Sequence, residues 1–487
     1  MIYNSFLPAR RAAITRQMPE ERRSFMRDIG EFSIVISASP TYNERRAAEI
    51  LKEAARLSCG ALLRIKSDSE PKDGPELVVG KTSREEGPDK ISEYTGARDL
   101  GRLWEYVILS SDDSIFITGL GVADPPKPYE SAYRIMQDGH IGTVFAAWRF
   151  AEEFLGYDPA FAPFDGFAAC GRASVPDSVG IVHTRESLAA QLPASAEGPV
   201  MWSVPTCSEL NLNMSCFIIK TAGGKLAVID GGRPGDAGHI VRCLEAAAYP
   251  DRPVVDVWLF SHLHVDHYGV PVNIARDPEL ASRIEVRRFC HHLLSEEFYT
   301  KTSREASPGA SVPYGVLSNF GKYTGAEVVT VERGDEIKLD ELTFRVIRVP
   351  SETPELSPLM NMNDSSVVYR LDIGGKHAAL FLGDSEWIAS GELLKHPEEL
   401  RADFLQVGHH GCGNVEFAVY RAVAPRSAIF QISSRFWYGD NGEGMNTHNT
   451  GVIRSRFFLK QLGLKTEDIL TDRYGIVTIP LPRPDGE

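Results

Sequence analysis

The stretch "LFSHLHVDHYG", residues 259–269, decides how this chain is interpreted. It places three of the thirteen histidines and an aspartate within six positions, directly after the apolar run 254–260. A structural histidine usually stands alone with one hydrogen-bonding partner. Four ligand-type side chains at the end of a predicted buried strand therefore indicate a metal site.

The size and charge of the chain limit what kind of protein it can be. A chain of 487 residues exceeds what one hydrophobic core usually holds, so two domains are expected. The formal net charge of -14 argues against a protein that coats nucleic acid electrostatically, because such proteins are usually basic. A local basic groove stays open.

The cysteines and the apolar runs predict where the protein works. The seven cysteines are scattered singly, without a CxxC pair, which suits a reducing compartment better than a disulfide framework. Residues 1–11 lack the apolar core of a secretion signal, and no apolar run is long enough to span a bilayer. We expect a soluble cytoplasmic protein that does not bind membranes.

The first part of the chain predicts a small α/β or α+β domain. Hydrophobic periodicity and turn residues predict strands at 32–37, 76–82 and 114–119 and helices at 44–60 and 141–156. The order of these segments, over residues 30–160, resembles the accessory domain that precedes the catalytic barrel in β-hexosaminidases and α-glucuronidases. That resemblance implies a packing or assembly module. We place its end near residue 195, within a linker rich in Pro, Ser, Ala and Gly.

The second domain, residues 196–487, begins with strands and hairpins. Residues 215–232 predict two strands joined at Gly223-Gly224, and a helix and a buried strand lead into the histidine motif, which is expected to form a loop. Residues 326–350 alternate with turns as antiparallel strands do. Further strands are expected at 365–373, 377–384, 403–411, 427–434 and 475–481, with a helix at 450–463.

The motif His262-x-His264-x-Asp266-His267, followed by Gly269, resembles the signature of the metallo-β-lactamase superfamily. Three later landmarks follow in the family's order: "FLGD" ending at Asp384, "VGHHG" with His409 and His410, and "THNTG" with His448. The resemblance covers residues 205–482. It implies an α/β fold, the four-layered αββα sandwich, with one or two metal ions at the sheet edges.

The spacing of the motif assigns its residues to two ions. His262 and His264 can turn their rings to one ion, while Asp266 and His267 reach a second. The resemblance implies that Asp384 bridges both ions and that a histidine of the 409–410 pair completes the second site. We favour His409 because it directly follows the strand, although the sequence does not separate the two.

The chain departs from the fuller family pattern between the motif and Asp384. Members with a complete dinuclear site carry a histidine there, whereas residues 347–371 contain none. The first ion would then have at most two histidines, Asp384 and water. We expect Zn²⁺, one or two ions per chain, with Mn²⁺ and iron as alternatives.

The segment "NDSSVVYRLDIGGKHAALFLGD", ending at Asp384, is similar to the hydrolase domain of the DNA-uptake competence channel protein. That branch is associated with phosphodiester cleavage, and a relative cleaves phosphorylcholine from wall teichoic acids. The resemblance implies a phosphodiesterase-like hydrolase that uses a metal-bound hydroxide on a small-molecule or carbohydrate-linked phosphoester. Asp266, His410 and His448 are its candidate catalytic residues. An acyl hydrolase (a lactonase, amidase or thioesterase) and a non-catalytic carbohydrate-binding or assembly protein are the alternatives, and the oligomeric state stays open.

Other polar residues near these motifs are expected to have supporting roles. Asp230, at the end of a predicted strand, should orient a ligand histidine. Asn363 and Ser366 should fix backbone geometry. The remaining candidates, expected as loop or pocket-wall residues and an inert thiol, are His291, His292 and Cys412.

Overall fold

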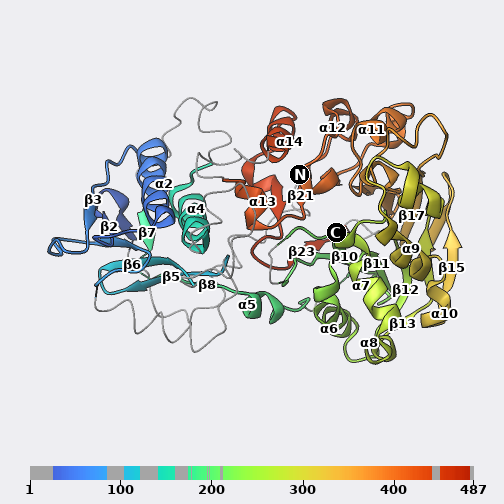
Figure 1. The fold of residues 1–487 in the computed structure, drawn as a ribbon, viewed down its shortest axis with the longest axis horizontal. Coiled ribbons are helices and arrows are strands. Elements are labelled where there is room, and N and C mark those ends of the chain that lie inside the picture. Colours follow the sequence, from blue (N-terminus) through green and yellow to red (C-terminus); the bar gives the residue numbers. More distant parts are fainter. Residues whose placement is uncertain are drawn as a thin grey trace.

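The computed structural model describes residues 26–84, 104–120, 141–158, 174–176, 178–194, 196, 198–208, 212–440 and 450–482. Within these residues the strands form three large sheets and one small two-stranded sheet. Figure 1 shows a smaller region formed by the first part of the chain, in blue and teal, beside a larger sandwich in green to red.

The smaller region is a six-stranded sheet with two helices on one face. The strand order is β3-β2-β4-β6-β5-β8. The strands are β2 (Ser33–Ile36), β3 (Ile65–Ser67), β4 (Glu76–Val79), β5 (Tyr106–Ser111), β6 (Ser114–Gly119) and β8 (Gly180–His183). Helices α2 (Tyr42–Cys59) and α4 (Ile141–Leu155) pack on this sheet and on each other (Figure 1).

Local sequence signals explain the bounds of α2. A capping box of Thr41 and Glu44 starts the helix, and Gly60 ends it in the left-handed conformation with φ of 68°. The elements that periodicity predicted in this region are confirmed to within three residues at each end. The resemblance to a glycosidase accessory domain stays a prediction.

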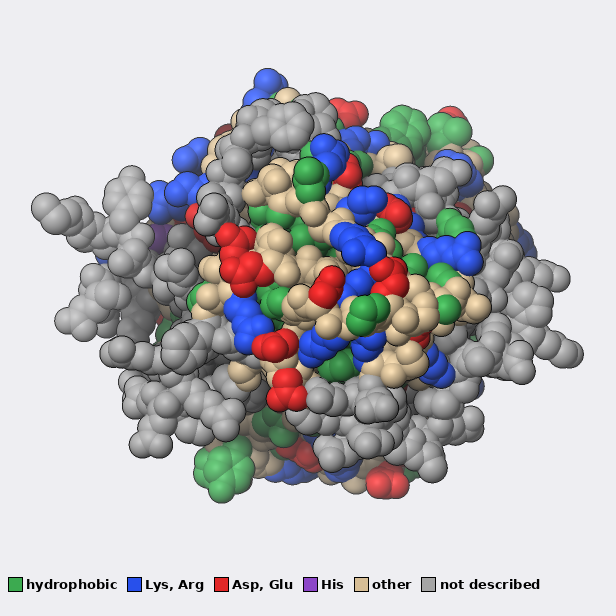
Figure 2. Space-filling view, turned by 90° about the vertical axis from the view of Figure 1, so that its left-hand side faces the viewer, with side chains coloured by type: hydrophobic (Ala, Val, Ile, Leu, Met, Phe, Trp, Pro, Cys, Tyr) green, Lys and Arg blue, Asp and Glu red, His purple; other side chains and the backbone are tan. Residues whose placement is uncertain are grey.

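The end of the molecule formed by this smaller region carries charges of both signs. On its described surface, Lys and Arg side chains alternate with Asp and Glu side chains (Figure 2). Arg64, for example, pairs with Glu70, and Lys66 lies 2.6 Å from Asp73. Interspersed charges of this kind give no extended field of one sign.

The larger region contains two sheets that face each other. The eight-stranded sheet has the order β15-β14-β12-β11-β10-β9-β23, with β13 also on β12, and the seven-stranded sheet runs in chain order from β16 to β22. The first consists of β9 (Val200–Ser203), β10 (Cys216–Lys220), β11 (Leu226–Asp230), β12 (Val254–Leu259), β13 (Glu285–Val286), β14 (Arg288–His291), β15 (Glu327–Thr330) and β23 (Val477–Pro480). The second consists of β16 (Glu336–Leu339), β17 (Leu342–Arg348), β18 (Val368–Ile373), β19 (His377–Phe381), β20 (Phe404–Gln406), β21 (Ser427–Phe430) and β22 (Ile469–Thr471).

Three apolar cores make this region a four-layered sandwich. The inner core lies between the sheets and joins residues such as Phe217 of one sheet to Tyr369 of the other. The outer face of the eight-stranded sheet packs against α6 (Ala237–Ala248), α7 (Val265–Arg276), α9 (Ser311–Leu317) and α10 (Phe320–Thr324). The seven-stranded sheet packs against α11 (Trp387–Leu393), α12 (Phe417–Val423) and α14 (Thr450–Gln461). The predicted αββα arrangement is confirmed.

Two details of the predicted secondary structure are wrong. The histidine motif was expected to be a loop, but α7 begins at Val265, so Asp266 and His267 lie in its first turn, where a carboxylate is favoured by the helix dipole. Residues 327–330 were expected in an antiparallel arrangement, but β15 pairs in parallel with β14. Only β16 and β17 form the expected antiparallel hairpin.

The two regions share one apolar core. The cluster on the outer face of the seven-stranded sheet continues into residues of α2 and α4. Helix α13 (Ser434–Tyr438) lies against α4, where Tyr438 stacks on Phe145 and Trp148. In the part of the chain that the structure describes, none of the helices is long and apolar enough to cross a bilayer.

Candidate metal centre

Strand ends bring the predicted ligands together at one edge of the sandwich. The segment after β12 carries His262 and His264, and α7 adds Asp266 and His267. Asp384 follows β19 of the opposite sheet. Gly383 makes this approach possible, because its φ is +57° and an added Cβ would lie 2.9 Å from the hydroxyl of Ser366.

The ligand atoms form two adjacent groups. One atom from each of His262, His264 and Asp384 lies within 4.8 Å of the other two, and the same is true of a second group, which consists of Asp266, His267 and His410. Asp384 lies between the groups, since its Oδ2 is 3.8 Å from His262 Nε2, 3.2 Å from His267 Nε2 and 3.5 Å from His410 Nε2. Two ligands of one tetrahedral ion, each at about 2.1 Å, lie about 3.4 Å apart. The spacing therefore fits ligands that share ions.

Unsatisfied buried atoms show that these residues fit a cation. The Nε2 atoms of His262, His267 and His410 and the Oδ1 atom of Asp384 are buried without a hydrogen-bond partner. Leaving a polar atom in this state costs about 1–3 kcal/mol each, so buried polar groups are normally satisfied. Four such atoms converging on one place are explained by divalent metal ions.

Hydrogen bonds behind the ligands fix the direction of their rings. His267 Nδ1 donates to Asp230 Oδ2 at 2.7 Å, and Asp230 also accepts from the backbone and hydroxyl of Ser261, both at 2.8 Å. His410 Nδ1 donates to the backbone carbonyl of Gln431 at 2.7 Å. Each bond leaves Nε2 as the atom that faces the centre. Asp230 thus lies where it can orient a ligand histidine.

The order of the two neighbouring histidines differs from the expectation. His409 and His410 both adopt left-handed backbone conformations, with φ of 47° and 53°, which separate their rings by 6.2 Å. His410, and not His409, joins the second group, with Nε2 at 3.6 Å from Asp266 Oδ2. His409 donates from Nδ1 to Glu386 at 2.7 Å, and its Nε2 lies 4.0 Å from Asp384 Oδ2.

The electrostatics of the centre favour positive charge. Burial disfavours the charged form of His267, but Asp384 and Asp230 raise its pKa to about 10. Burial also disfavours the charged form of His410, but Asp384 raises the pKa of this histidine well above its ordinary value. His262 has fewer carboxylate contacts, and burial lowers its pKa. A cation on the Asp384 side is therefore favoured.

The other predicted residues lie around this centre. Ser366 Oγ accepts from the backbone N–H of Asp384 at 3.0 Å, and Asn363 donates to Glu386 at 3.4 Å. The side chains of His291 and His292 bond to nearby backbone groups, and Cys412 Sγ lies 3.7 Å from Asn213 Nδ2. His448 lies outside the described residues.

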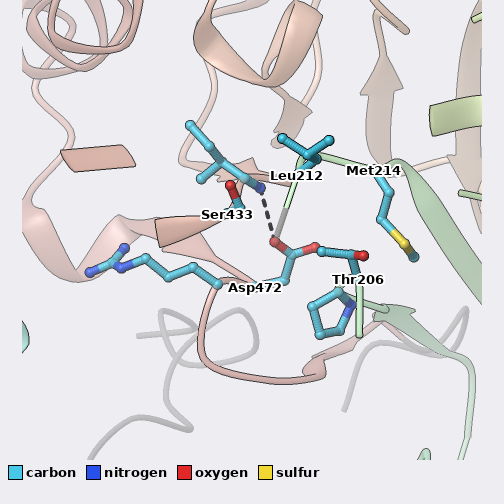
Figure 3. A pocket seen from close by; sticks show the side chains of 8 residues that line it. Thr206, Leu212, Met214, Ser433 and Asp472 are labelled. Carbon is cyan, nitrogen blue, oxygen red and sulfur yellow. Dashed lines mark hydrogen bonds between the residues drawn. The ribbon is translucent and has the colours of Figure 1, made fainter. Parts of the chain in front are cut away.

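A buried line of hydrogen bonds extends from His410 away from the centre. The backbone carbonyl of Gln431 accepts from His410, and its side-chain amide donates to Ser203 Oγ at 3.0 Å. Ser203 in turn donates to Asp472 at 2.8 Å. Asp472 also accepts from Ile432 N at 3.0 Å and lines a small pocket with Thr206 and Ser433 (Figure 3). The pocket is thus adjacent to the support of His410.

Three charged residues at the centre are not among those that the sequence predicts. Arg233 Nη2 lies 3.3 Å from Asp266 Oδ2, and Arg233 Nε donates to the Asn213 carbonyl at 2.7 Å. Glu386 holds His409, and Glu305 Oε2 lies 3.5 Å from His264 Nε2. Glu386 stands two positions after Asp384, which was the one available signal; no motif marks the other two.

Comparisons with known proteins agree with this geometry. Residues 212–356 match the model of the metallo-beta-lactamase superfamily. The larger region of the chain, which contains the matched residues, has the fold of that superfamily. Members of this superfamily are generally hydrolases, and the matched residues include the whole His262–His267 motif.

Relatives of this metallo-β-lactamase-fold protein include ComE operon protein 3 of Bacillus subtilis (strain 168), 30% identical over 114 residues. The match covers 22% of this chain, which spans 13% of that protein's length. It confirms the predicted relationship to the competence protein. Similar solved structures include the metallo-beta-lactamase fold protein YhfI from Bacillus subtilis (11% identity, TM-score 0.35, 58% of this chain and 99% of that chain). Another is CmlA, a diiron beta-hydroxylase from Streptomyces venezuelae (16% identity, TM-score 0.37, 70% and 60%).

Proposed function

We propose that the protein is a metal-dependent hydrolase that acts on a phosphoester or phosphodiester bond. The observation that carries this proposal is the pair of ligand groups that share Asp384. Divalent ions bound there supply a nucleophilic water at neutral pH and neutralise charge on phosphoryl oxygens. Zn²⁺ is the ion that imidazole ligands favour, with Mn²⁺ and iron as alternatives.

The chain's own residues divide the work of binding and orientation. Asp384 holds the two groups at a fixed separation, and the Asp230–His267 bond keeps the ring of His267 directed at the centre. Arg233, with one-fifth of its side chain exposed, offers guanidinium N–H groups beside Asp266. A guanidinium N–H donates a charge-assisted hydrogen bond to a phosphate oxygen, which supports an anionic phosphoryl substrate.

The proposed substrate is a small molecule or a carbohydrate that carries a phosphoester. His410, held by Gln431, orients the second group, while His448 stays a predicted proton donor to the leaving oxygen. The variant R233Q should hydrolyse phosphodiesters more slowly than wild type does. Its effect on neutral esters should be smaller, because only phosphodiesters carry a negative charge that Arg233 can bind.

The central experiment compares wild type with the double variant D266A/H267A. We expect hydrolysis of a generic aryl phosphodiester by wild type, dependence on added divalent metal, and loss of both activity and bound metal in the variant. H396A is a matched control, because His396 belongs to an exposed histidine–carboxylate cluster with Glu398 and Glu399. It should behave as wild type.

A parallel panel of phosphoryl and acyl substrates tests the substrate class. Turnover of lactones, amides or thioesters with no turnover of any phosphoester would overturn the phosphoryl assignment and leave a metal-dependent acyl hydrolase. Bound metal with no turnover of either class would favour a protein that uses metal for folding or assembly.

A further inference from the structure

The two ligand groups are unequally complete. The second group has three protein ligands and shares Asp384, which makes four. The first group has His262, His264 and Asp384, which is one fewer than the four protein ligands of a closed tetrahedral site. His264 is also the most exposed of these ligands, with 28% of its side chain accessible, so the open side of the group faces solvent.

A carboxylate lies at this open side. Glu305 Oε2 is 3.5 Å from His264 Nε2, close to the spacing of about 3.4 Å expected of two ligands on one tetrahedral ion. The same spacing relates His410 to Asp384 in the second group. Glu305 therefore contacts His264 from outside the group that His262, His264 and Asp384 form.

The backbone around Glu305 fixes it in this position. The amide of Arg304 donates to the carbonyl of Met360 at 2.9 Å, and the amide of Met362 donates to Glu305 Oε2 at 3.2 Å. These bonds join the segment before Pro308 to the loop that precedes β18. A side chain anchored at both its backbone and its carboxylate is pre-positioned, which lowers the entropy lost on binding an ion.

We propose that Glu305 is the solvent-side ligand of the first ion. The inference rests on the metal centre of the proposed function and not on its substrate. It gives that ion two imidazoles and two carboxylates, the same donor set as the second group, which has two imidazoles with Asp266 and the shared Asp384. Compared with a site without Glu305, the added carboxylate brings an oxygen ligand, which suits Mn²⁺.

The test measures metal binding by the full-length protein. Wild type, E305Q and E305H are stripped of metal and titrated with Mn²⁺, with free Mn²⁺ followed by electron paramagnetic resonance and bound ions counted by elemental analysis. We expect two ions on wild type. E305Q should retain one ion and lose at least about tenfold in affinity for the other. E305H should bind two ions again but prefer Zn²⁺ over Mn²⁺ at the restored position.

The control is E297Q, which removes a carboxylate from the preceding segment. Glu297 is 64% exposed and pairs with Lys301 instead of facing the centre. It should bind both ions as wild type does. Two ions of unchanged affinity on E305Q, or an equal loss in E297Q, would overturn the role of Glu305 while leaving the metal centre intact. Absence of any bound ion on wild type would overturn both this inference and the proposed function.

Discussion

Two buried polar clusters of this molecule differ in how their carboxylates are satisfied. In the metal centre, imidazole Nε2 atoms and a carboxylate oxygen converge without hydrogen-bond partners. In the second cluster, which we call the Glu152 cluster (Arg149, Glu152, Trp437, Tyr438, Arg473 and Tyr474), the carboxylate of Glu152 accepts hydrogen bonds from four side chains. Aromatic rings cover its guanidinium groups, with Arg149 at 4.0 Å and Arg473 at 4.3 Å from the Tyr474 ring centre.

This difference in hydrogen bonding distinguishes a binding site from a cluster that only holds two parts of the structure together. Both clusters are buried, but a carboxylate that already accepts four hydrogen bonds has little left to offer a ligand. The Glu152 cluster joins α4 of the smaller region to α13 and the segment before β23. We therefore expect its loss to change stability, and loss of the metal centre to change chemistry.

The largest effect is expected from D384N in the metal centre. Asp384 is shared by both ligand groups, so its replacement should remove most bound metal and lower the hydrolytic rate by more than about 10³-fold. Elemental analysis and steady-state kinetics on the same sample check this. A variant that keeps two ions and a rate within tenfold of wild type contradicts the central place of Asp384.

The next effect should come from E152A in the Glu152 cluster. Removing this carboxylate leaves the buried Arg473 without its anionic partner, which should lower the free energy of unfolding by about 3–5 kcal/mol. The neighbouring E153A removes an i,i+4 partner of Arg149 that is 21% exposed, and should cost less than about 1 kcal/mol. Urea denaturation measures both. Equal losses of stability in E152A and E153A, or loss of bound metal from folded E152A, would contradict the distinction between a structural cluster and a metal site.

A smaller effect is expected from D230N, which acts on the metal centre indirectly. Asp230 accepts a hydrogen bond from His267 but is not itself one of the predicted metal ligands. D230N should therefore weaken metal binding by about 10–100-fold without abolishing it. The control is D256N on the adjacent strand β12, where Asp256 accepts from Leu226 N and pairs with Arg287. Metal titration should show no change in that control; an equal loss there would mean that general destabilisation explains both.

Local patterns of the sequence account for most of the fold and for the core of the candidate site. The helix 141–156 and the strand 114–119 follow from periodicity and glycine stops, and the structure has them at Ile141–Leu155 and Ser114–Gly119. The motif of His262 to His267 lies in one segment, so its members remain close in any fold that orders it. Asp384 was expected from the resemblance of "FLGD" to the superfamily's pattern, and it follows an apolar strand.

Features that depend on tertiary contacts or on the sign of φ were not predictable. Two consecutive left-handed residues decide that His410, rather than His409, joins Asp266 and His267, and no propensity of histidine marks such a backbone. Arg233 and Glu305 reach the centre only through the packing of distant loops. The parallel pairing of β15 depends on which sheet this strand joins. The alternation of apolar and polar residues in its sequence does not predict that sheet.

A change in pH dependence is expected at Asp472, the residue that connects the two clusters. It supports the His410 line of hydrogen bonds through Ser203, and the next residue is Arg473 of the Glu152 cluster. Burial raises the pKa of Asp472 to about 7, against the opposing hydrogen bonds from Ser203 and Ile432 N. Because the unfolded carboxyl ionises near pH 4, the folded state binds the extra proton between these values, and stability falls as pH rises through this window.

The variant D472N should remove this slope. Wild type should lose up to about 1.4 kcal/mol of unfolding free energy per pH unit between about pH 4 and 7, whereas D472N should be flatter by that amount. S203A keeps the carboxyl but removes a donor to its ionised form, so its loss should extend to higher pH. Urea denaturation at pH 5, 6, 7 and 8 distinguishes the three proteins. If D472N leaves the slope of unfolding free energy against pH unchanged, Asp472 is already ionised in the folded protein. The residue that connects the two clusters is then a charged carboxylate instead of a neutral acid.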